Sequence, residues 1–355
     1  MPGSPALWAA TLALALVGAG ACGDDKSFLA TDPPVTTTTS TGQGGAGGEG
    51  GAGGAGGAGA GTPVEPAGAP KLTVVNGVND HEAIRICFVP YPGSDGSGVL
   101  PWPSSAAGLP FAEGAAIAPI DAVAPPGEDV QIHVVAGDLG ATAGLDCAEI
   151  LALSAGGQGS VVAAALPVVP ASAFVAERSL LLVPAGCLGG PGHSDPAEIA
   201  GCGPGYSAET PTASLVAAPM SRVTEADRIG FQVVHASAAT PKVDVRLATA
   251  GDASMWLVAP GLGFGSIGPF PPFLTLDALE LGIASQAEIR TYAPGQTTAP
   301  SSVVSMGQVL EGSAVSAADL VDGRGFVLVA VGAAPGVAEG PFWHALTYAL
   351  VPADP

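Results

Sequence analysis

Five histidines and five cysteines are the side chains of this sequence best suited to binding a metal or to acting as bases and nucleophiles. No two histidines have the spacing with which one helix or hairpin presents a pair of ligands, and no C-x2-C pair is present. Local spacing therefore predicts no metal site, no cofactor and no catalytic residue. Only a fold that joins distant segments could gather the histidines, which are His81, His133, His193, His235 and His344.

Two short segments resemble active-site motifs without the surroundings that those motifs need. Gly263–Gly268 reads GFGSIG and fits a dinucleotide-binding loop, but that loop must lead into a helix, and Pro269 prevents one. Gly192–Pro196 resembles the turn that carries a nucleophilic serine, yet proline replaces its final glycine. We therefore expect neither nucleotide binding nor a nucleophilic role for Ser194.

The remaining polar loops are expected to have structural roles. His193 and Asp195 are predicted to lie in a solvated loop, in which Asp195 or its neighbouring serine caps a helical turn that begins at Pro196. Gly93–Gly98 and Asn76–Glu82 could offer oxygen atoms to calcium, but they lack the spaced carboxylates of an EF-hand. His133 and His344 are expected on strand faces.

Cys22 directly follows an apolar segment, Ala6–Ala21, that ends in three small residues. This segment is shorter than the ~20 apolar residues that span a bilayer, and it is typical of a secretory signal. The cysteine after it resembles that of a bacterial lipobox, whose thiol is acylated and becomes the new N-terminus. We predict a signal peptide over 1–21 and lipidation at Cys22; ordinary cleavage after Ala21 and an uncleaved anchor are the alternatives.

The segment 22–70 is rich in threonine, glycine, alanine and proline, and it offers little apolar surface to bury. Such a composition favours a disordered chain, because ordering it would cost conformational entropy without a compensating core. The glycines keep no strict three-residue period, which excludes a collagen-like helix. We predict a flexible tether that holds the folded part of the chain away from a lipid surface.

The four other cysteines are even in number, which in an exported protein indicates disulfides. Three pairings are possible. We favour Cys187 with Cys202, since these residues bracket a polar loop, and this leaves Cys87 to pair with Cys147 and to join two strand-like segments.

Acidic residues greatly outnumber basic ones, with Lys+Arg 10 against Asp+Glu 31. The resulting negative field repels phosphate groups, so we exclude nucleic-acid binding. A protein, glycan or cell-wall ligand and the membrane, through the lipid anchor, remain as expected partners.

Apolar and polar residues alternate along several segments, and proline and glycine separate them, so an all-β protein is expected. Short helical turns are expected only near 197–200 and 317–321. Three blocks in the first half recur in the same order in the second half; the first of these pairs begins at Lys71 and Gly230. We predict two tandem β-sandwiches, over 71–225 and 226–355.

The start of the second copy carries a recognisable pattern, VVHASAATPKVDV. It resembles the strand-turn-strand signature of the bacterial domain of unknown function 4397, and the first copy matches it less closely. The resemblance implies immunoglobulin-like sandwiches in an exported or cell-surface protein without assigned catalytic residues, and a structural hydrogen bond from His235. The matching residues are Val233, Val234, His235, Ala236, Ser237, Pro241, Val243, Asp244 and Val245.

These observations predict a noncatalytic lipoprotein, anchored to the outer membrane or cell surface, whose sandwich modules serve binding or adhesion. The alternative is an envelope hydrolase whose carboxylates are gathered from distant loops. A concave pocket with converging carboxylates would favour the enzyme, and flat loop ends would favour the binding protein.

Overall fold

The computed structural model describes residues 68–156, 160–175, 178–249, 254–275, 286–341 and 343–354. Within these ranges β-strands dominate and form four sheets, to which three short α-helices are attached. The expected all-β fold is confirmed. The predicted signal peptide, Cys22 and nearly all of the predicted tether lie outside the described residues.

The first sandwich is made of two sheets from residues 71–220. In one sheet the strand order is β5-β1-β8-β9, with β2 continuing β1 alongside β8; in the other it is β4-β3-β6-β7. β1 and β2 run parallel to β8, and the other neighbours are antiparallel. The strands are β1 (Lys71–Val75), β2 (Gly77–Val78), β3 (Ala83–Tyr91), β4 (Leu109–Pro110), β5 (Gly114–Ile117), β6 (Asp129–Gly137), β7 (Val161–Ala165), β8 (Ser179–Gly186) and β9 (Ser214–Met220).

The second sandwich repeats this arrangement. Its sheets have the orders β13-β10-β16-β17 and β12-β11-β14-β15, and β10 runs parallel to β16 as β1 does to β8. The matching strand orders agree with the duplication inferred from the repeated blocks. The strands are β10 (Gly230–His235), β11 (Val243–Ala248), β12 (Met255–Leu262), β13 (Ile267–Leu274), β14 (Glu288–Tyr292), β15 (Ser302–Ser305), β16 (Gly325–Val331) and β17 (Thr347–Pro352).

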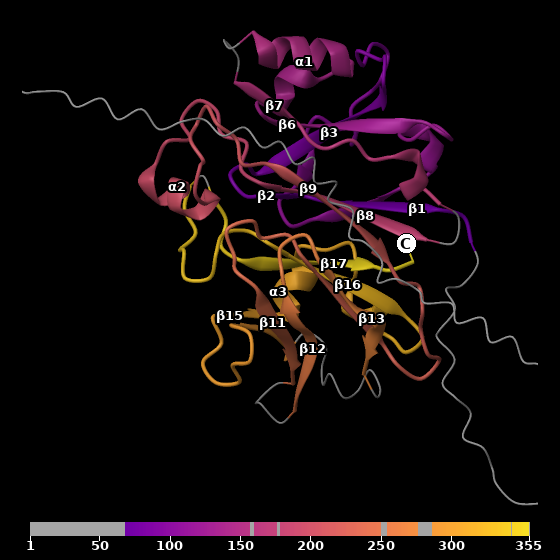
Figure 1. Ribbon diagram of the computed structural model, residues 1–355, viewed down its shortest axis with the longest axis vertical. Coiled ribbons are helices and arrows are strands. Elements are labelled where there is room, and N and C mark those ends of the chain that lie inside the picture. Colours follow the sequence, from indigo (N-terminus) through magenta and orange to yellow (C-terminus); the bar gives the residue numbers. More distant parts are fainter. Residues whose placement is uncertain are drawn as a thin grey trace, which may run out of the picture.

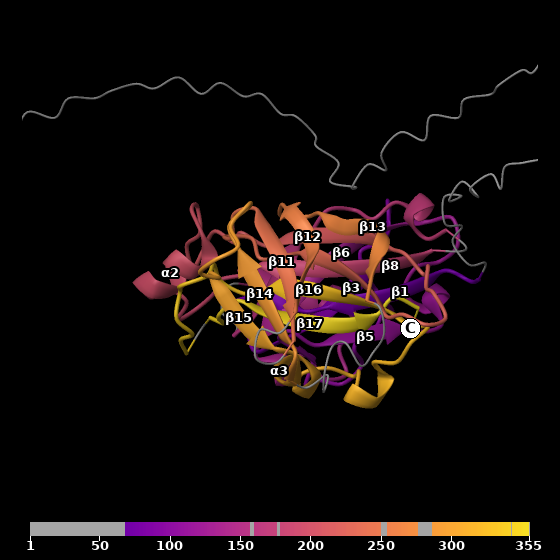
Figure 2. The same cartoon turned by 90° about the horizontal axis from the view of Figure 1, so that it is seen from below.

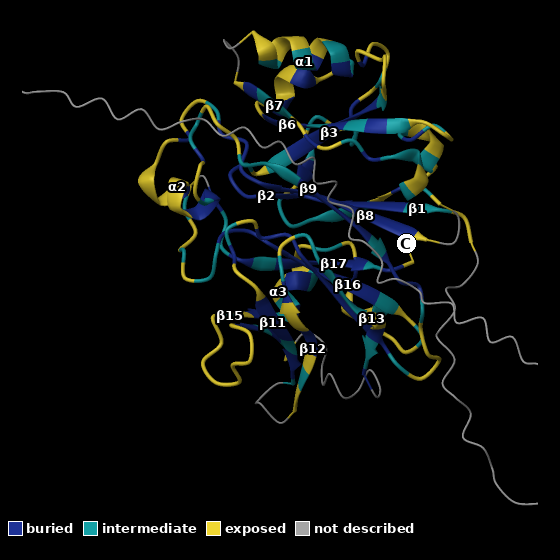
Figure 3. Cartoon of the chain, in the orientation of Figure 1, coloured by how far each residue is buried: buried dark blue, intermediate teal, exposed yellow. Residues whose placement is uncertain are grey.

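The four sheets are stacked, with an apolar layer between each pair of neighbours (Figures 1 and 2). The first layer is the core of the first sandwich and the third is the core of the second. The middle layer joins the copies, because it combines Leu181 and Val183 of β8 with Val327 and Val329 of β16. Figure 3 shows the inner sheets as mostly buried, in contrast to the outer loops.

Strand β8 illustrates why polar residues are few in the inner sheets. Leu180 and Leu182 face the core of the first sandwich, whereas Leu181 and Val183 face the second copy. All eight residues of β8 are buried. A strand that is covered on both sides is therefore apolar at nearly every position, as parallel sheets in other folds also show; the buried Ser179 at its start is satisfied by a hydrogen bond from Arg222.

Matched glycines end β8 and β16. Gly186 and Gly332 have φ angles of 92° and 99°, which are strained for residues with a side chain. A Cβ at either glycine would collide with a backbone carbonyl, that of Thr212 or Ala345. The two glycines therefore allow the chain to turn sharply out of each inner sheet at the same end of the molecule.

The helices are short and capped. α2 (Pro196–Cys202) and the 3-10 turn Ala317–Asp319 lie where helical turns were expected, and Asp195 caps α2 by accepting the Ala197 N–H at 2.8 Å. The sequence analysis missed α1 (Cys147–Ala155) and α3 (Met306–Glu311), although both begin with a capping box.

Both favoured disulfides are present in the structure. Cys87 bonds to Cys147 with their Cα atoms 5.7 Å apart, and Cys187 bonds to Cys202 with a Cα separation of 5.6 Å. One detail of the prediction was wrong: Cys147 is the first residue of α1 rather than part of a strand, so this bond ties β3 to a helix that packs on the outside of the sheet.

Candidate functional site

The candidate site lies where the loops that follow β1 and β8 meet. Because β1 and β8 run parallel, the segments that follow them leave the sheet at the same end. One of these segments carries Asp80 and His81, and the other runs from Cys187 through α2 to β9. The second copy also contributes, since α2 packs on Trp343, whose Cδ1 atom lies 3.5 Å from a Cβ position on Gly201. Figure 1 shows α2 beside the yellow loop of the second copy.

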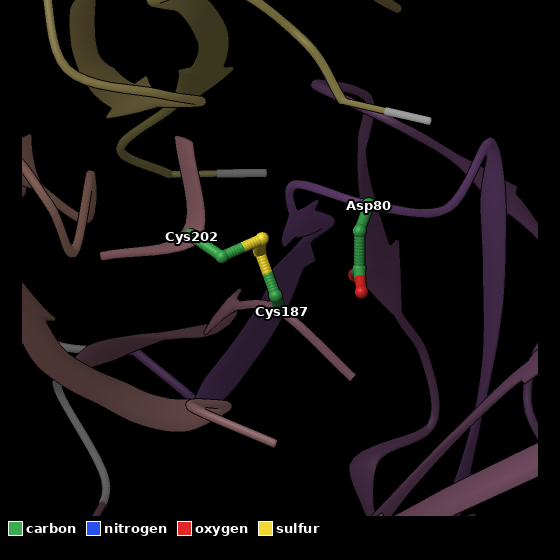
Figure 4. A group of neighbouring side chains, drawn as sticks. All are labelled: Asp80, Cys187 and Cys202. Atoms are coloured by element: carbon green, nitrogen blue, oxygen red, sulfur yellow. A yellow bond between two sulfur atoms is a disulfide. The ribbon is translucent and has the colours of Figure 1, made fainter. Parts of the chain in front are cut away.

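Asp80 is buried beside the Cys187–Cys202 disulfide, as Figure 4 shows. Its two carboxylate oxygens accept the backbone N–H groups of Leu188 at 2.9 Å and of Gly189 at 2.7 Å. The Tyr206 hydroxyl adds a longer bond of 3.4 Å. Asp80 thus fixes the first turn of the long loop, and the disulfide fixes its far side.

His81 and His193 face each other at the centre of the site, with ring centroids 4.5 Å apart. The His81 ring is held by the Gly189 carbonyl, which accepts from Nε2 at 3.0 Å. Burial lowers the pKa of His81, the Asp80 charge partly restores it, and charge on His193 lowers it again. His81 is therefore mainly a neutral imidazole near pH 7.

Glu198 supports His193 from the first turn of α2. Its Oε1 atom lies 2.6 Å from Nδ1 of His193, and the Glu198 side chain is completely buried. Burial raises the pKa of Glu198, while the hydrogen bond and charge of His193 act in the opposite direction. The second oxygen, Oε2, has no hydrogen-bond partner among the described residues.

Tyr206 closes this cluster from the end of the long loop. Its hydroxyl donates to the backbone carbonyl of His193 at 3.2 Å as well as to Asp80. Burial and the nearby charges of Asp80 and Glu198 raise the pKa of the phenol well above its ordinary value. Tyr206 therefore stays protonated and acts as a hydrogen-bond donor.

A cavity of about 340 Å³ opens beside the two histidines. Both copies line it, and a second cavity of about 240 Å³ shares His81, Gly137 and His193 with it. The polar side chains that line the larger cavity are Asp80, His81, Glu82, His193 and His344.

His344 comes from the second copy and lies against the first. Its ring stacks on Phe111 with the centroids 4.0 Å apart and an interplanar angle of 9°. Its backbone N–H donates to the Asn79 side chain at 3.0 Å, and its Nδ1 lies 3.5 Å from the exposed Glu339. The expectation that His344 lies on a strand face was wrong, because β17 begins only at Thr347.

Two groups of residues in the described ranges have the proximity of metal ligands. Asp80, His81 and His193 each offer one donor atom, and these atoms lie within 4.8 Å of one another. The other group combines Asp80 with Cys187 and Cys202. Those two sulfur atoms are bonded to each other, so they supply no thiolate for a metal.

The other predicted residues have the structural roles that the sequence suggested, with one exception. His235 is buried and its Nε2 donates to the Pro241 carbonyl at 3.1 Å, which pins the turn after β10. Ser194 is exposed, and the segment after Gly263–Gly268 is a strand rather than a helix. The exception is His193, which is 8% exposed and not solvated as expected.

Most of the remaining motif residues are buried in strands; Ala236, Ser237 and the exposed Pro241 lie in the connection between β10 and β11. Val233 and Val234 of β10 face opposite sides, toward the second core and the middle layer. Asp244 accepts the backbone N–H groups of Gly261 and Gly295 at 2.7 and 2.9 Å. The motif is therefore part of the scaffold, and it lies outside the histidine cluster.

Sequence reasoning missed this cluster because its members are far apart in the chain. His81 and the Gly189 carbonyl that it contacts are separated by 108 residues. A usable signal was nevertheless present. The sequence N-D-H-E over 79–82 and the loop that carries His193 both follow the ends of strands that pair in parallel.

No protein-family model and no curated protein matches the chain. The resemblance to the domain of unknown function 4397 stays a prediction, and the chemistry of the site rests on its geometry. No helix within the described ranges combines the length and apolar character needed to cross a membrane.

Proposed function

We propose that this chain is a noncatalytic lipoprotein of the cell envelope whose paired sandwiches bind a ligand in the cavity between the copies. The observation that carries the proposal is the difference between equivalent loops. The first copy joins its last two strands through 187–213, with a helix and a disulfide, whereas the second copy needs only 332–346. The longer loop adds nothing to either sheet, but its His193 lines the cavity between the copies, and 189–191 line the smaller cavity beside it.

The rigidity of this loop supports a binding role. Asp80, Tyr206 and the disulfide hold the long loop against the first sandwich, and Trp343 of the second copy packs on α2. A preformed cavity binds with a smaller loss of entropy than one that must be ordered by its ligand.

The proposed location has separate support. Two disulfides are typical of proteins outside the reducing cytosol. The apolar leader, Cys22 and the glycine-rich segment up to residue 70 fit a lipid anchor followed by a tether. We include the proposed kinship with the domain of unknown function 4397, whose members are typically exported.

Hydrogen exchange with cell-wall fragments from the source organism tests the binding proposal. The full chain is compared with and without the fragments by mass spectrometry. Slower exchange is expected in 76–83, 188–193 and 341–344. Exchange should be unchanged in 312–324, which leads into β16 at the end of the strand away from the cavity. Protection confined to 312–324, or none anywhere, would contradict the proposal.

The anchor has its own test. Mass spectrometry of the mature chain should find acyl groups on Cys22, and Cys22→Ala should move the protein from the membrane fraction to the soluble fraction. An unmodified N-terminus at Met1 or Cys22 would exclude this anchor while leaving the cavity proposal intact.

An envelope hydrolase is the second candidate, and the cavity itself favours it. Asp80 and Glu82 both line the cavity beside two histidines, which is the convergence that a hydrolase needs. Against this, both oxygens of Asp80 already accept backbone N–H groups. Turnover of chromogenic glycosides or esters that is lost in Glu82→Gln would favour the enzyme over the binding protein.

A further inference from the structure

Two carboxylates are buried in the cluster, and within the described ranges no lysine or arginine forms an ion pair with either of them. The side chains of Asp80 and Glu198 are 0% exposed. Among the described residues, their only ion-pair partners are His81 and His193. Buried carboxylates are costly unless a positive charge or several hydrogen bonds compensate them. Asp80 has such hydrogen bonds, whereas Oε2 of Glu198 has no partner within hydrogen-bond distance in the described part of the chain.

We propose that Asp80, His81 and His193 bind a divalent transition-metal ion such as Zn²⁺. The three side chains already place donor atoms within 4.8 Å of one another, and His81 Nε2 lies 3.9 Å from Oδ2 of Asp80. On binding, the ion would take the place of the proton that His81 Nε2 donates to the Gly189 carbonyl. Two imidazoles and one carboxylate form a donor set that suits zinc, with an open position left for water or a ligand. The adjacent cavity provides the space for that ligand.

Glu198 fits the role of a positioning residue for His193. Metal-bound histidines commonly donate their other ring N–H to a carboxylate, which orients the ring and makes it a stronger ligand. The 2.6 Å contact between Glu198 and Nδ1 of His193 has this form. The ion would also supply the positive charge that the buried Glu198 lacks.

The loops hold the proposed ligands before any ion binds. The Gly189 carbonyl fixes the His81 ring, and the Gly189 N–H fixes Asp80, so one loop residue orients two ligands. The Cys187–Cys202 disulfide restrains that loop directly before this residue. The inference rests on the proposed function in one respect, that the cavity between the copies is the ligand site.

Calorimetric titration of the chelator-stripped full chain with Zn²⁺ tests the proposal. One saturable site per chain is expected, and His81→Asn or His193→Asn should abolish it. Glu198→Gln should weaken binding about 10- to 100-fold, as the loss of an outer carboxylate usually does. His133→Asn is the matched control, because His133 lies on β6 in the first sandwich, and it should leave binding unchanged. Saturable binding that survives the His81 and His193 substitutions would overturn the proposal.

A measurement on the unaltered protein guards against variants that fail to fold. Anomalous diffraction at the zinc edge from crystals soaked in Zn²⁺ should give a peak among Asp80, His81 and His193. A peak elsewhere, or none, overturns the assignment. No envelope ligand is present in either experiment, so a negative zinc result leaves the proposed function standing, and a negative exchange result leaves the zinc site standing.

Discussion

The two copies differ far more in their loops than in their strands. Both have the same strand order, including the parallel pair at the centre of each inner sheet. In the first copy the long connection 187–213 carries a helix and a disulfide, and Asp80 and His81 stand where the repeat alignment gives the second copy alanine and threonine. The comparison teaches that the sandwich is a scaffold used twice, whereas the ionisable cluster was built on one copy.

One position shows the same structural task performed by different chemistry. In the first copy Asn76 donates to the Leu109 carbonyl and accepts from the Val78 N–H, both at 2.9 Å. His235 is its counterpart in the second copy and holds its own turn through Pro241. A polar side chain is thus required at the end of this strand, and only its type differs between the copies.

The largest expected effect comes from the layer that joins the copies. Leu181→Ala and Leu182→Ala truncate neighbouring residues of β8, one facing the second copy and the other facing the first core. Because both side chains are fully buried, each change should cost about 2–5 kcal/mol of unfolding free energy. Urea unfolding measures it. A stability unchanged by Leu181→Ala would show that the middle layer contributes little.

The two disulfides should differ in what their removal affects. Cys87–Cys147 closes 60 residues and Cys187–Cys202 closes 15, so chain entropy predicts losses of about 4 and about 3 kcal/mol for paired serine substitutions. Thermal unfolding compares the two variants. Only the second pair lies at the candidate site, so only its removal should also weaken Zn²⁺ binding. Equal effects on zinc would argue against a local role for Cys187–Cys202.

Because of Tyr348, the folding stability of the second copy is expected to fall at alkaline pH. Burial raises the pKa of Tyr348 to about 12, and its hydroxyl lies 2.7 Å from that of Thr291. Since the folded pKa exceeds the unfolded value of about 10, its stabilising contribution is complete below pH 10 and is lost as pH rises to about 12.

The measurement is the difference in unfolding free energy between the wild type and Tyr348→Phe. This difference should change by roughly 2–3 kcal/mol between pH 10 and 12, in favour of the variant. Tyr91→Phe serves as the control because Tyr91 is 49% exposed. If the unfolding free energy of Tyr348→Phe fell by as much as that of the wild type between pH 10 and 12, the assignment would be refuted.

The smallest effect is expected from a substitution that exchanges the residue type between equivalent turns of the two copies. His235→Asn gives the second copy the residue of the first, but the shorter side chain does not reach the Pro241 carbonyl in the same way. Loss of that hydrogen bond should cost about 1 kcal/mol, with zinc binding unchanged. Chemical denaturation and the zinc titration together check it, and weaker zinc binding would link a turn of the second copy to the site.

The strands and the duplication could be predicted from the sequence because their cause is local. Alternating segments such as β3 and β11 show which residues point inward, and glycine and proline mark the turns. α1 was missed although Asp146 and Glu149 form its capping box, because only Cys147 and Ile150 of this short helix are buried and its apolar periodicity is weak.

The site could not be predicted because its cause is not local. Asp80 and Gly189 meet only once β1 and β8 pair in parallel, and no spacing in the sequence reports that pairing. Likewise the burial of His193 depends on α2 folding back so that Glu198 reaches its ring. With the strand order known, the common end of the two strands would have been the place to look.

The middle layer has a consequence for how the molecule is made. The face of β8 that carries Leu181 and Val183 packs mainly on residues that follow it in the chain, among them Val327 and Val329. During synthesis the first half therefore leaves the ribosome with this apolar face of its sheet exposed. The exposed face favours aggregation until the second half has been made. A shortened gene that ends after Met220 would leave that surface permanently open, so the pair is the smallest unit that can be produced cleanly.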